Sequence, residues 1–403
     1  MKILFLTQWF DPEPTPKGLE FVKMLITLGY EVDVLTSIPN YPLGKYYPGY
    51  KFSFIQKEIM DDVSVYRVPI YPSHDSSSIR RFFTYFTFCI SSLFSGFFLS
   101  KKADLIYAYH PPHVGFIASC ICKIRKIPLV HDVQDIWPDT FLSTGMIKNK
   151  MLLRLLSKFS HWVYSQADSL IVISDGFKNL LVGRGLPEEK INLIYNWSEE
   201  LKLAEPQERQ NNPIKGNKKF NFMFAGNMGS AQNLHLLLKA AKELMDCSPD
   251  IQFNFVGDGL ELATLKEYSA KHNLKNVLFI PRVPMNEVGG FLSSADVLVV
   301  HLKSDPLFEI TVPSKIQAYL FIGKPILNNV SGDAEKIIEN ASAGFTSSSG
   351  SVSSLVDSIN KFHTMSKNEL EAMGKRGKNY YQKNLSLNNG TLRTDSIFRK
   401  LIK

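Results

Sequence analysis

Apolar segments of strand length alternate with amphipathic segments along most of the chain. The first apolar run, residues 2–10, is followed by a loop with proline and glycine, by the helical pattern "GLEFVKMLITLGY", and by a second strand over Glu31–Ser37. A strand, a helix and a strand in this order form the unit of a doubly wound parallel sheet. The same order begins again at "KFNFMFAGNMGSAQNLHLLLKAAKELM" and continues into "IQFNFVGDG". The pattern predicts an α/β fold with two doubly wound, Rossmann-like domains.

A polar segment, residues 197–219, separates the two strand–helix systems. It combines charged residues with prolines, asparagines and a glycine, which is typical of a linker. We expect an N-terminal domain over residues 1–196, a C-terminal domain over residues 220–380, and a helix within residues 381–403 that packs back toward the N-terminal domain. Ligands bind at the carboxyl ends of the strands in such sheets, so two facing domains predict a binding cleft between them.

The segment "RRFFTYFTFCISSLFSGFFLSKK", residues 80–102, has no charged residue between its two arginines and its two lysines. Its length is sufficient to cross a bilayer. However, it carries six Ser and Thr residues and lies between strands of one predicted sheet. We expect a helix over about residues 82–99 with one face toward lipid and its flanking cations near anionic head groups. A buried core helix and a transmembrane helix are the alternatives.

Composition limits the classes of partner. The net charge is +8, and the lysines are spread along the chain without a dense basic run. This pattern argues against a nucleic-acid partner and is compatible with a membrane surface or an anionic substrate. The four cysteines lack the spacing of a zinc site and are expected to be reduced thiols. The N-terminal apolar run is too short for a signal peptide, so we expect a cytoplasmic protein.

The stretch "PLFEITVPSKIQAYL" predicts an anion site at a helix N-terminus. Pro313 suits the first helical position, and Thr311 can cap the helix from outside. The backbone N–H groups of Ser314 and Lys315 would then point out of the helix end. A cation in this turn is unfavourable by about 0.3–1 kcal/mol unless an anion binds beside it. The stretch therefore indicates a site for a diphosphate, and the alternative is a capped surface helix with solvated charges.

Two of the charged residues before this helix are further candidates. Glu309 lies on the loop, where a carboxylate can accept hydrogen bonds from sugar hydroxyls. Lys303 follows a predicted strand and provides another cation at its carboxyl end.

Five blocks together resemble the retaining glycosyltransferases of family 4, which have the two-domain GT-B fold. The blocks are "FEITVPSKIQAYLFIGKPIL", "PNYPLGKYYPGY", "HPPHVG", "HDVQDIWPDT" and "AGNMGSAQNL". The resemblance covers nearly the whole chain and is greatest for the branch that builds O-antigen and capsule repeat units, in particular the L-fucosamine transferases. It implies transfer, with retention, of an N-acetylated 6-deoxyhexose such as L-FucNAc from a UDP-linked nucleotide sugar.

The resemblance also implies a location, an acceptor and the absence of a cofactor. The acceptor would be an undecaprenyl-diphosphate-linked oligosaccharide, and the enzyme would lie on the inner face of the cytoplasmic membrane. We see no clustered acidic motif for a metal and expect transfer without metal or cofactor. A nucleotide-sugar epimerase of the same fold and a non-catalytic nucleotide-binding module are the alternative functions.

The resemblance assigns roles to residues of the C-terminal domain. Family members place an arginine and a lysine where this chain has Asn227 and Gln232, so Lys303, Lys315 and Arg282 are candidates to replace those cations. The second glutamate of the family's pair falls on Gln317 or on Ala318. Glu309 is a catalytic candidate, and the donor-binding candidates are Gly18, Asn227, Gln232, Arg282, Val283, Lys303, Thr311, Val312, Pro313, Ser314, Lys315 and Gln317.

Four residues of the N-terminal domain complete the predicted site. His110, the second catalytic candidate, ends the strand "LIYAYH", where family members often place a residue that touches the donor sugar, although a structural role is the alternative. Asp135 is expected to orient an acceptor hydroxyl, or else to have a capping or structural role. Gly18 would open the first helix near the donor phosphates, and Lys17 beside it is an acceptor-binding candidate.

Overall fold

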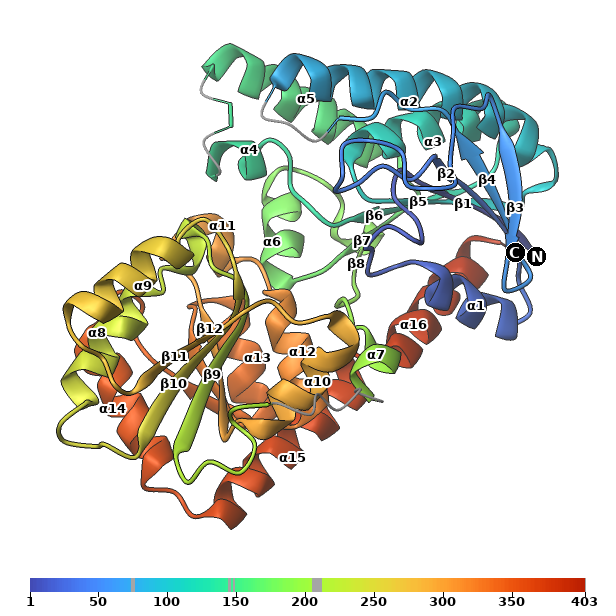
Figure 1. The fold of residues 1–403 in the computed structure, drawn as a ribbon. Helices are drawn as coiled ribbons and strands as arrows, with labels where there is room; N and C mark the ends of the chain where they lie inside the picture. The colour runs from blue at the N-terminus through green and yellow to red at the C-terminus, as the bar shows by residue number, and fades with distance from the viewer. Residues whose placement is uncertain (74–76, 144–145, 148, 205–211, 403) are drawn as a thin grey trace. The chain divides into compact units, whose positions relative to one another are not determined.

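The computed structural model describes residues 1–73, 77–143, 146–147, 149–204 and 212–402. The chain divides into two compact units, Met1–Tyr195 together with Asn388–Lys403, and Asn196–Leu387. Each unit holds one sheet with helices on both of its faces (Figure 1). This arrangement confirms the prediction of two doubly wound α/β domains.

The first unit is built on an eight-stranded sheet in the order β3-β4-β2-β1-β5-β6-β7-β8. All neighbours are parallel except β3 and β4. Every side chain of β5 and β6 is buried, as expected for parallel strands covered on both faces. The elements are β1 (Lys2–Thr7), α1 (Leu19–Thr27), β2 (Glu31–Ser37), β3 (Gln56–Met60), β4 (Val63–Val68), α2 (Ser78–Leu99), β5 (Leu105–Tyr109), α3 (Pro112–Arg125), β6 (Leu129–Val133), α4 (Asp139–Ser143), α5 (Lys150–Gln166), β7 (Ser169–Val172), α6 (Asp175–Gly183), β8 (Ile191–Leu193) and α16 (Leu387–Leu401).

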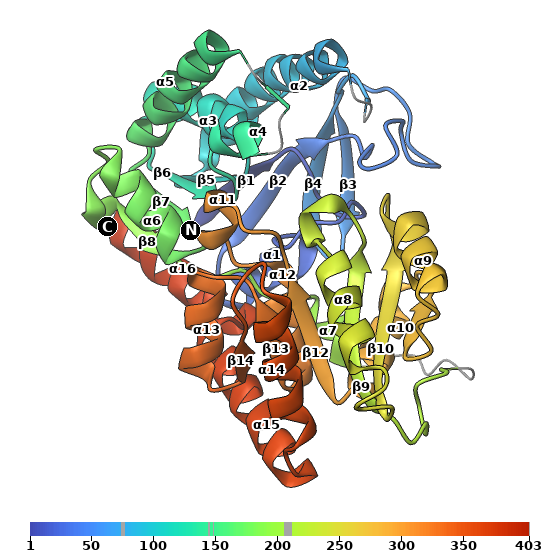
Figure 2. The same cartoon turned by 90° about the vertical axis from the view of Figure 1, so that its left-hand side faces the viewer.

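Helices α2, α3 and α5 form a layer on one face of this sheet, with α3 in contact with both of the others (Figures 1 and 2). Helices α1 and α16 lie on the opposite face (Figure 1). The hydroxyl of Tyr30 donates to Oδ1 of Asp395 in α16 at 2.7 Å, and the ring of Phe398 packs edge-on against Tyr107. The last helix of the chain is therefore part of the first unit.

Helix α2 begins four residues before the predicted segment, because Ser77 caps it by accepting the N–H of Arg80 at 3.4 Å. Within the part of the chain that the structure describes, Ile79–Lys102 is the one helical segment long and apolar enough to cross a bilayer. Its most apolar window has a mean hydropathy of 1.6, and only 28% of that window is buried. A long apolar helix of which most residues stay at least partly accessible to solvent is unusual in a unit of this size.

The second unit is built on a six-stranded parallel sheet in the order β11-β10-β9-β12-β13-β14. Its strand order reverses between β9 and β12, and ligands bind at such reversals in doubly wound sheets. The elements are α7 (Glu200–Ala204), β9 (Phe220–Asn227), α8 (His235–Leu244), β10 (Ile251–Asp258), α9 (Leu262–Lys271), β11 (Val277–Ile280), α10 (Met285–Ser294), β12 (Val297–His301), α11 (Pro306–Glu309), α12 (Ser314–Ile322), β13 (Ile326–Asn329), α13 (Asp333–Ala341), β14 (Gly344–Thr346), α14 (Val352–His363) and α15 (Lys367–Asn384).

The predicted linker is partly helical. Residues 200–204 form α7, which packs on α10 and α12 within the second unit. Residues 205–211 of the predicted linker lie outside the described residues.

A buried ion pair joins three parts of the first unit. Lys17, in the loop after β1, pairs with Asp132 in β6, and both side chains are fully buried. The Lys17 ammonium also donates to the hydroxyl of Tyr107 at 3.3 Å, and Tyr107 in turn donates to Asp132. Gln134 donates to the other oxygen of the same carboxylate. The β1–α1 loop, β5 and the segment after β6 are therefore held by one carboxylate.

Replacing Lys17 with Met would leave the Asp132 carboxylate buried without its cation. Removal of one partner of a buried ion pair costs about 3–5 kcal/mol. We expect K17M to lower the free energy of unfolding of the first unit by that amount, measured by urea denaturation and circular dichroism. The double variant K17M/D132N should lose less than the sum of the single variants. Lys23→Met, at an exposed ion pair, is the control and should change stability by less than about 1 kcal/mol; an equally small effect of K17M would contradict the expectation.

Candidate functional site

A cavity of about 530 Å³ lies in the first unit. Residues from the loop after β1, the segment after β2, the first turns of α2, the end of β5 and the segment after β6 line it. The strand order of the sheet reverses between β1 and β5, so the cavity lies where a doubly wound sheet binds its ligand. Its lining includes Trp9, Tyr41, Tyr85, His110, Gln134 and Asp135.

His110 directly follows β5 with a φ of 65°, a left-handed conformation that is uncommon outside glycine. Its N–H donates to the carbonyl oxygen of Asp132 at 2.9 Å, and its own carbonyl oxygen lies 3.2 Å from Nε2 of His131. On the side chain, Nε2 lies 3.4 Å from Oδ2 of Asp135. Burial lowers the pKa of His110, against the smaller opposing effect of Asp135. The imidazole is therefore neutral at neutral pH.

The rest of the block "HPPHVG" orders the wall around His110. Pro112 is the first residue of α3, where its fixed φ suits a helix start. His113 places Nε2 2.7 Å from Oε1 of the cavity residue Gln8, and burial lowers the pKa of His113 to about 3. A neutral His113 can donate to Gln8 through Nε2. A Cβ added to Gly115 would lie 2.3 Å from Cε1 of His131, so only glycine allows this close approach.

Asp135 faces the same cavity as His110, with its side chain about half exposed. The other members of the block "DIWPD" have structural contacts. Trp137 is buried, and Asp139 accepts from Nη2 of Arg184 through both carboxylate oxygens at 2.7 Å. Of the two aspartates, Asp135 is the one available to a ligand.

The structure places Lys17 and Gly18 beside the cavity and not on its surface. The Lys17 ammonium is fully buried in its pair with Asp132. Gly18 precedes α1, and a Cβ at this position would lie 2.1 Å from Oδ2 of Asp11. That oxygen accepts the N–H of Leu19 at 2.7 Å and so fulfils the capping role at the start of α1.

In the second unit, Lys315 lies against the turn at the end of β9. A Cβ added to Gly226, which has a φ of 129°, would lie 3.0 Å from Cε and 3.1 Å from Nζ of Lys315. The hydroxyl of Tyr319 accepts the N–H of Ala225 at 3.2 Å and ties α12 to the same strand. The structure therefore brings together the "AGNMGSAQNL" turn and the start of α12.

Lys315 is a largely buried cation without an acidic partner among the residues that the structure describes. Its Nζ lies 4.5 Å from the centre of the Phe224 ring, and burial lowers the pKa of Lys315 to about 8. Over the same residues, no acceptor is found for the backbone N–H groups of Ser314 and Lys315. A desolvated ammonium beside open N–H groups at a helix N-terminus favours a bound anion.

The start of α12 differs in detail from the prediction. Pro313 is the residue before the helix, and no side chain caps this end. Thr311 donates its hydroxyl to the carbonyl oxygen of Leu307 at 2.6 Å, so it completes α11 and leaves α12 open. Gln317 is buried, and in the amide orientation that satisfies both ends of its side chain the nitrogen donates to the Pro313 carbonyl oxygen at 2.8 Å. Val312 is also buried. Open N–H groups and Lys315 are what this end presents to a ligand.

The other donor-binding candidates follow strands of the second sheet or lie on α11. The backbone N–H of Lys303 donates to the carbonyl oxygen of Ala231 at 2.8 Å, which places Lys303 beside the β9–α8 turn. Glu309 is exposed at the end of α11. Arg282 is exposed after β11, whereas the adjacent Val283 is buried.

Within the β9–α8 turn itself, Gln232 folds back and Asn227 stays exposed. Oε1 of Gln232 accepts the N–H of Gly229 at 3.0 Å, so this side chain orders the turn. Across the described ranges, no group of three or more His, Cys, Asp or Glu side chains lies close enough to hold a metal ion.

Sequence reasoning missed the aromatic lining of the first cavity. Trp9 packs 5.3 Å from the ring of His110 and 5.7 Å from that of Tyr41, and Tyr85 stacks on His113 at 4.6 Å. The position of Trp9 at the end of a predicted first strand was the available signal. Tyr41 lies in the block "PNYPLGKYYPGY", but nothing in the sequence placed it beside Trp9, and Tyr85 carried no signal at all.

Comparison with known proteins agrees with this two-unit organisation. Residues 19–197 match the family model for a glycosyl transferase 4-like domain, and residues 205–380 match that for glycosyl transferases group 1. The Escherichia coli K12 protein WcaI, whose name assigns it as a colanic acid biosynthesis glycosyl transferase, is 26% identical over 347 residues, covering 80% of this chain and 82% of WcaI.

Two solved structures share the fold over the full length. Sucrose-phosphate synthase from Thermosynechococcus elongatus is 16% identical with a TM-score of 0.74, covering 99% of this chain and 98% of that one. HepE of Anabaena, solved in complex with UDP, is 16% identical with a TM-score of 0.72, and 100% of each chain is covered. Together, the two family matches and the shared fold place this chain in the GT-B glycosyltransferases.

Proposed function

We propose that the protein transfers a sugar from a UDP-linked nucleotide sugar to a lipid-linked oligosaccharide during the synthesis of a cell-surface polysaccharide. The observation that carries the proposal is Lys315, a largely buried cation against Gly226 at the open end of α12. A nucleoside diphosphate provides the charge that this end favours. The likeness to WcaI, named for colanic acid, supports the polysaccharide, and the UDP complex of HepE supports the nucleotide.

The proposed donor site uses the edge of the second sheet. Lys315 and the N–H groups at the start of α12 hold the diphosphate, with Lys303 as a further cation. Glu309 accepts hydrogen bonds from the donor sugar, and the segment of Arg282 and Val283 meets the base. In this assignment Gln317 is buried and makes no contact with the ribose.

The proposed reaction proceeds with retention. The bond from the anomeric carbon to the diphosphate oxygen breaks, a bond to the acceptor hydroxyl oxygen forms on the same face, and the hydroxyl proton passes to the departing diphosphate. The α12 end and Lys315 stabilise the charge on the leaving group. No metal is required for this step, since the ammonium and the N–H groups supply the positive potential.

The cavity of the first unit is the proposed acceptor site. Its aromatic lining suits the apolar faces of sugar rings, and Asp135 can accept a hydrogen bond from the attacking hydroxyl. His110 is proposed to contact the reacting sugar as a neutral imidazole. The resemblance to L-fucosamine transferases supports an N-acetylated 6-deoxyhexose such as L-FucNAc as the transferred sugar.

A membrane-binding surface on the first unit is the last part of the proposal. Helices α2, α3 and α5 contain no Asp or Glu, but they carry seven cations: Arg80, Arg81, Lys123, Arg125, Lys150, Arg154 and Lys158. Large apolar side chains are exposed on α2 at spacings of three and four residues: Ile79, Phe82, Phe83, Phe86, Ile90, Leu93, Phe94 and Phe98. Exposed apolar residues among cations fit the surface of an anionic membrane.

Helix α5 extends the same surface. Three of its four exposed large apolar residues, Met151, Leu155 and Trp162, share one side of the helix, next to a side that carries its cations; the fourth is Leu152. Because the acceptor cavity includes residues from the first turns of α2, a peripheral position on the cytoplasmic membrane would bring a lipid-linked acceptor to it.

Replacing Lys315 with Met should weaken donor binding. A charge-assisted contact to a phosphate contributes about 1.5–3 kcal/mol, so we expect the Kd for UDP, measured by calorimetry, to rise roughly 10- to 150-fold. In the wild type the Kd should also rise as the pH exceeds about 8, where Lys315 loses its proton, and K315M should lack this rise. Lys324→Met is the control, because burial lowers the pKa of Lys324 as well but it follows the far end of α12. Equal affinities of K315M and wild type would refute the donor site.

His110→Asn should slow transfer with little change in donor affinity. Asn tolerates the left-handed backbone at this position, so the fold is retained. Loss of one contact to the reacting sugar lowers kcat by about 10²–10³-fold, measured with candidate UDP-sugars and membranes that contain lipid-linked acceptors. A kcat close to that of the wild type would exclude the role.

Incubation with the nucleotide sugar but without acceptor separates a transferase from an epimerase, since an epimerase would still form the epimer.

Phe86→Glu combined with Phe94→Glu should release the protein from membranes. The two exposed rings lie on the same side of α2, and charged side chains cannot enter the apolar part of the interface. We expect the wild type to sediment with vesicles that contain anionic phospholipid, less so at high salt, and the double variant to stay in solution. Leu260→Glu changes a side chain of the second unit that is 96% exposed and should not affect binding. A wild type that fails to bind at low salt would refute the surface.

A further inference from the structure

Glu13 is a buried carboxylate in the loop after β1, with only 2% of its surface exposed. Its Oε1 accepts the backbone N–H of Asn40 at 2.8 Å and that of Tyr41 at 2.7 Å. Its Oε2 accepts the N–H of Phe10 at 3.4 Å. One side chain thus satisfies three backbone donors from two segments that are far apart in the sequence.

The two segments form one wall of the acceptor cavity. The loop after β1 contributes Trp9 and Thr15 to the lining, and the segment after β2 contributes Asn40 and Tyr41. Glu13 itself does not line the cavity but lies behind it. The carboxylate is therefore placed to fix the distance between the two halves of this wall.

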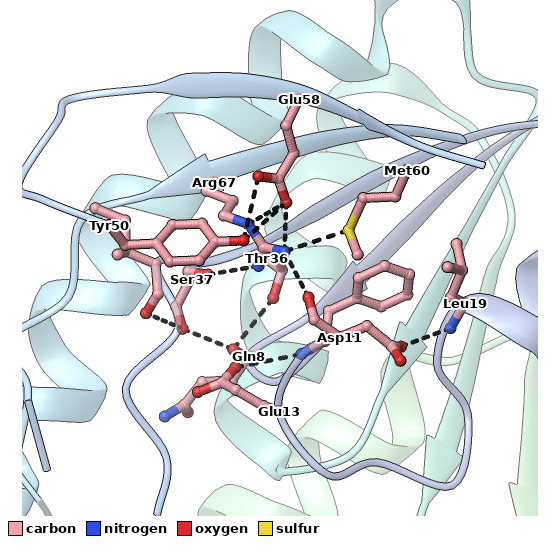
Figure 3. A network of polar contacts seen from close by, with 12 residues as sticks. Gln8, Asp11, Glu13, Leu19, Thr36, Ser37, Tyr50, Glu58, Met60 and Arg67 are labelled. Atoms are coloured by element: carbon pink, nitrogen blue, oxygen red, sulfur yellow. Dashed lines mark hydrogen bonds and ion pairs between the residues drawn. The ribbon is translucent and has the colours of Figure 1, made fainter. Parts of the chain in front are cut away.

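A second set of contacts holds the same segments from the strand side (Figure 3). The carbonyl oxygen of Gln8 accepts the hydroxyl of Ser37 at 2.8 Å and that of Thr36 at 3.2 Å. The buried guanidinium of Arg67 donates to the carbonyl oxygen of Asp11 and, at 3.4 Å, to that of Ser37. These contacts reach only as far as Ser37. Further along, the carboxylate of Glu13 accepts the backbone N–H groups of Asn40 and Tyr41, and the ring of Trp9 packs against that of Tyr41.

We infer that Glu13 is a positioning residue, whose carboxylate holds the Asn40–Tyr41 segment against the loop after β1 and so shapes the acceptor cavity. The inference rests on the proposed function for the assignment of the cavity as the acceptor site. The contacts of Glu13 do not depend on that assignment. A carboxylate suits this place because it can accept several N–H bonds at once and, when ionised, bonds to them about twice as strongly as a neutral acceptor.

The surroundings of Glu13 make its charge sensitive to pH. Burial raises the pKa of Glu13 to about 7, although the three N–H donors and the charge of Arg67 oppose the rise. The charge of Glu13 in turn contributes to raising the pKa of Tyr47, whose main cause is burial. Across the sheet edge, Arg67 of β4 is paired with Glu58 of β3. As the pH falls through about 7, Glu13 gains a proton and its bonds to Asn40 and Tyr41 weaken.

Three variants test the inference by hydrogen–deuterium exchange and kinetics. Glu13→Ala removes the acceptor, so the amides of Asn40 and Tyr41 should exchange at least about tenfold faster, whereas the second unit is unchanged. Glu13→Gln keeps an amide oxygen as acceptor and should restore most of the protection. Glu20→Gln, at an exposed position of α1, is the control and should leave exchange as in the wild type. Unchanged exchange at Asn40 and Tyr41 in E13A would overturn the inference.

The kinetic readout separates this inference from the proposed function. E13A should raise the KM for the acceptor by about tenfold or more and leave the Kd for UDP unchanged. In the wild type the acceptor KM should rise as the pH falls through about 7, and E13Q should lack that rise because it cannot titrate. Faster exchange in E13A with an unchanged acceptor KM would support the positioning role and refute the cavity as the acceptor site. A pH profile of E13Q equal to that of the wild type would overturn the role of the Glu13 charge.

Discussion

The cavity of the first unit depends on the ion pair and hydrogen bonds of the Asp132 carboxylate. This carboxylate accepts from Lys17, Tyr107 and Gln134, which belong to the β1–α1 loop, β5 and the segment after β6. A buried carboxylate is tolerated only when it is paired and fully hydrogen-bonded, so these elements cannot shift independently. The same elements carry Trp9, His110 and Asp135 into the cavity. A buried charge that does not line the cavity therefore fixes the residues that do.

Each unit has a buried lysine, and the two lysines differ in whether a carboxylate lies beside the ammonium. In the first unit, Lys17 is neutralised by Asp132 and serves the fold. In the second, Lys315 lies over the ring of Phe224 at a helix start whose N–H groups are open, and burial lowers the pKa of this lysine. A desolvated charge without compensation costs stability, so its persistence at a strand-order reversal is typical of a site completed by a ligand. Burial alone does not distinguish a structural lysine from a binding one, whereas the partner of the ammonium does.

The alternation of apolar and amphipathic segments was sufficient to predict the fold. Where a strand ends and which side chains are buried depend on long-range contacts. The pattern predicts β2 with its observed bounds, because all but its first residue are buried. The pattern extends β1 to residue 10, whereas the strand ends at Thr7. At the next residue, the carbonyl oxygen of Gln8 accepts hydrogen bonds from the hydroxyls of Thr36 and Ser37. Spacing singled out Lys315 because a helix end is a local feature. The burial of Lys17 depends on Asp132, 115 residues further on, and no local pattern indicates it.

The contacts of α16 have a consequence for how the chain is made. The first unit is discontinuous, since it takes residues 1–195 and then the last helix, and Tyr30 meets its partner Asp395 across 365 residues. During synthesis the sheet of the first unit emerges long before the helix that covers part of it, so Tyr30 and the face around Tyr107 lack their α16 partners until residues 388–401 have been made. The second unit, by contrast, is complete as one continuous segment, Asn196–Leu387. Order of synthesis and order of completion are therefore reversed: the half that begins first is finished last.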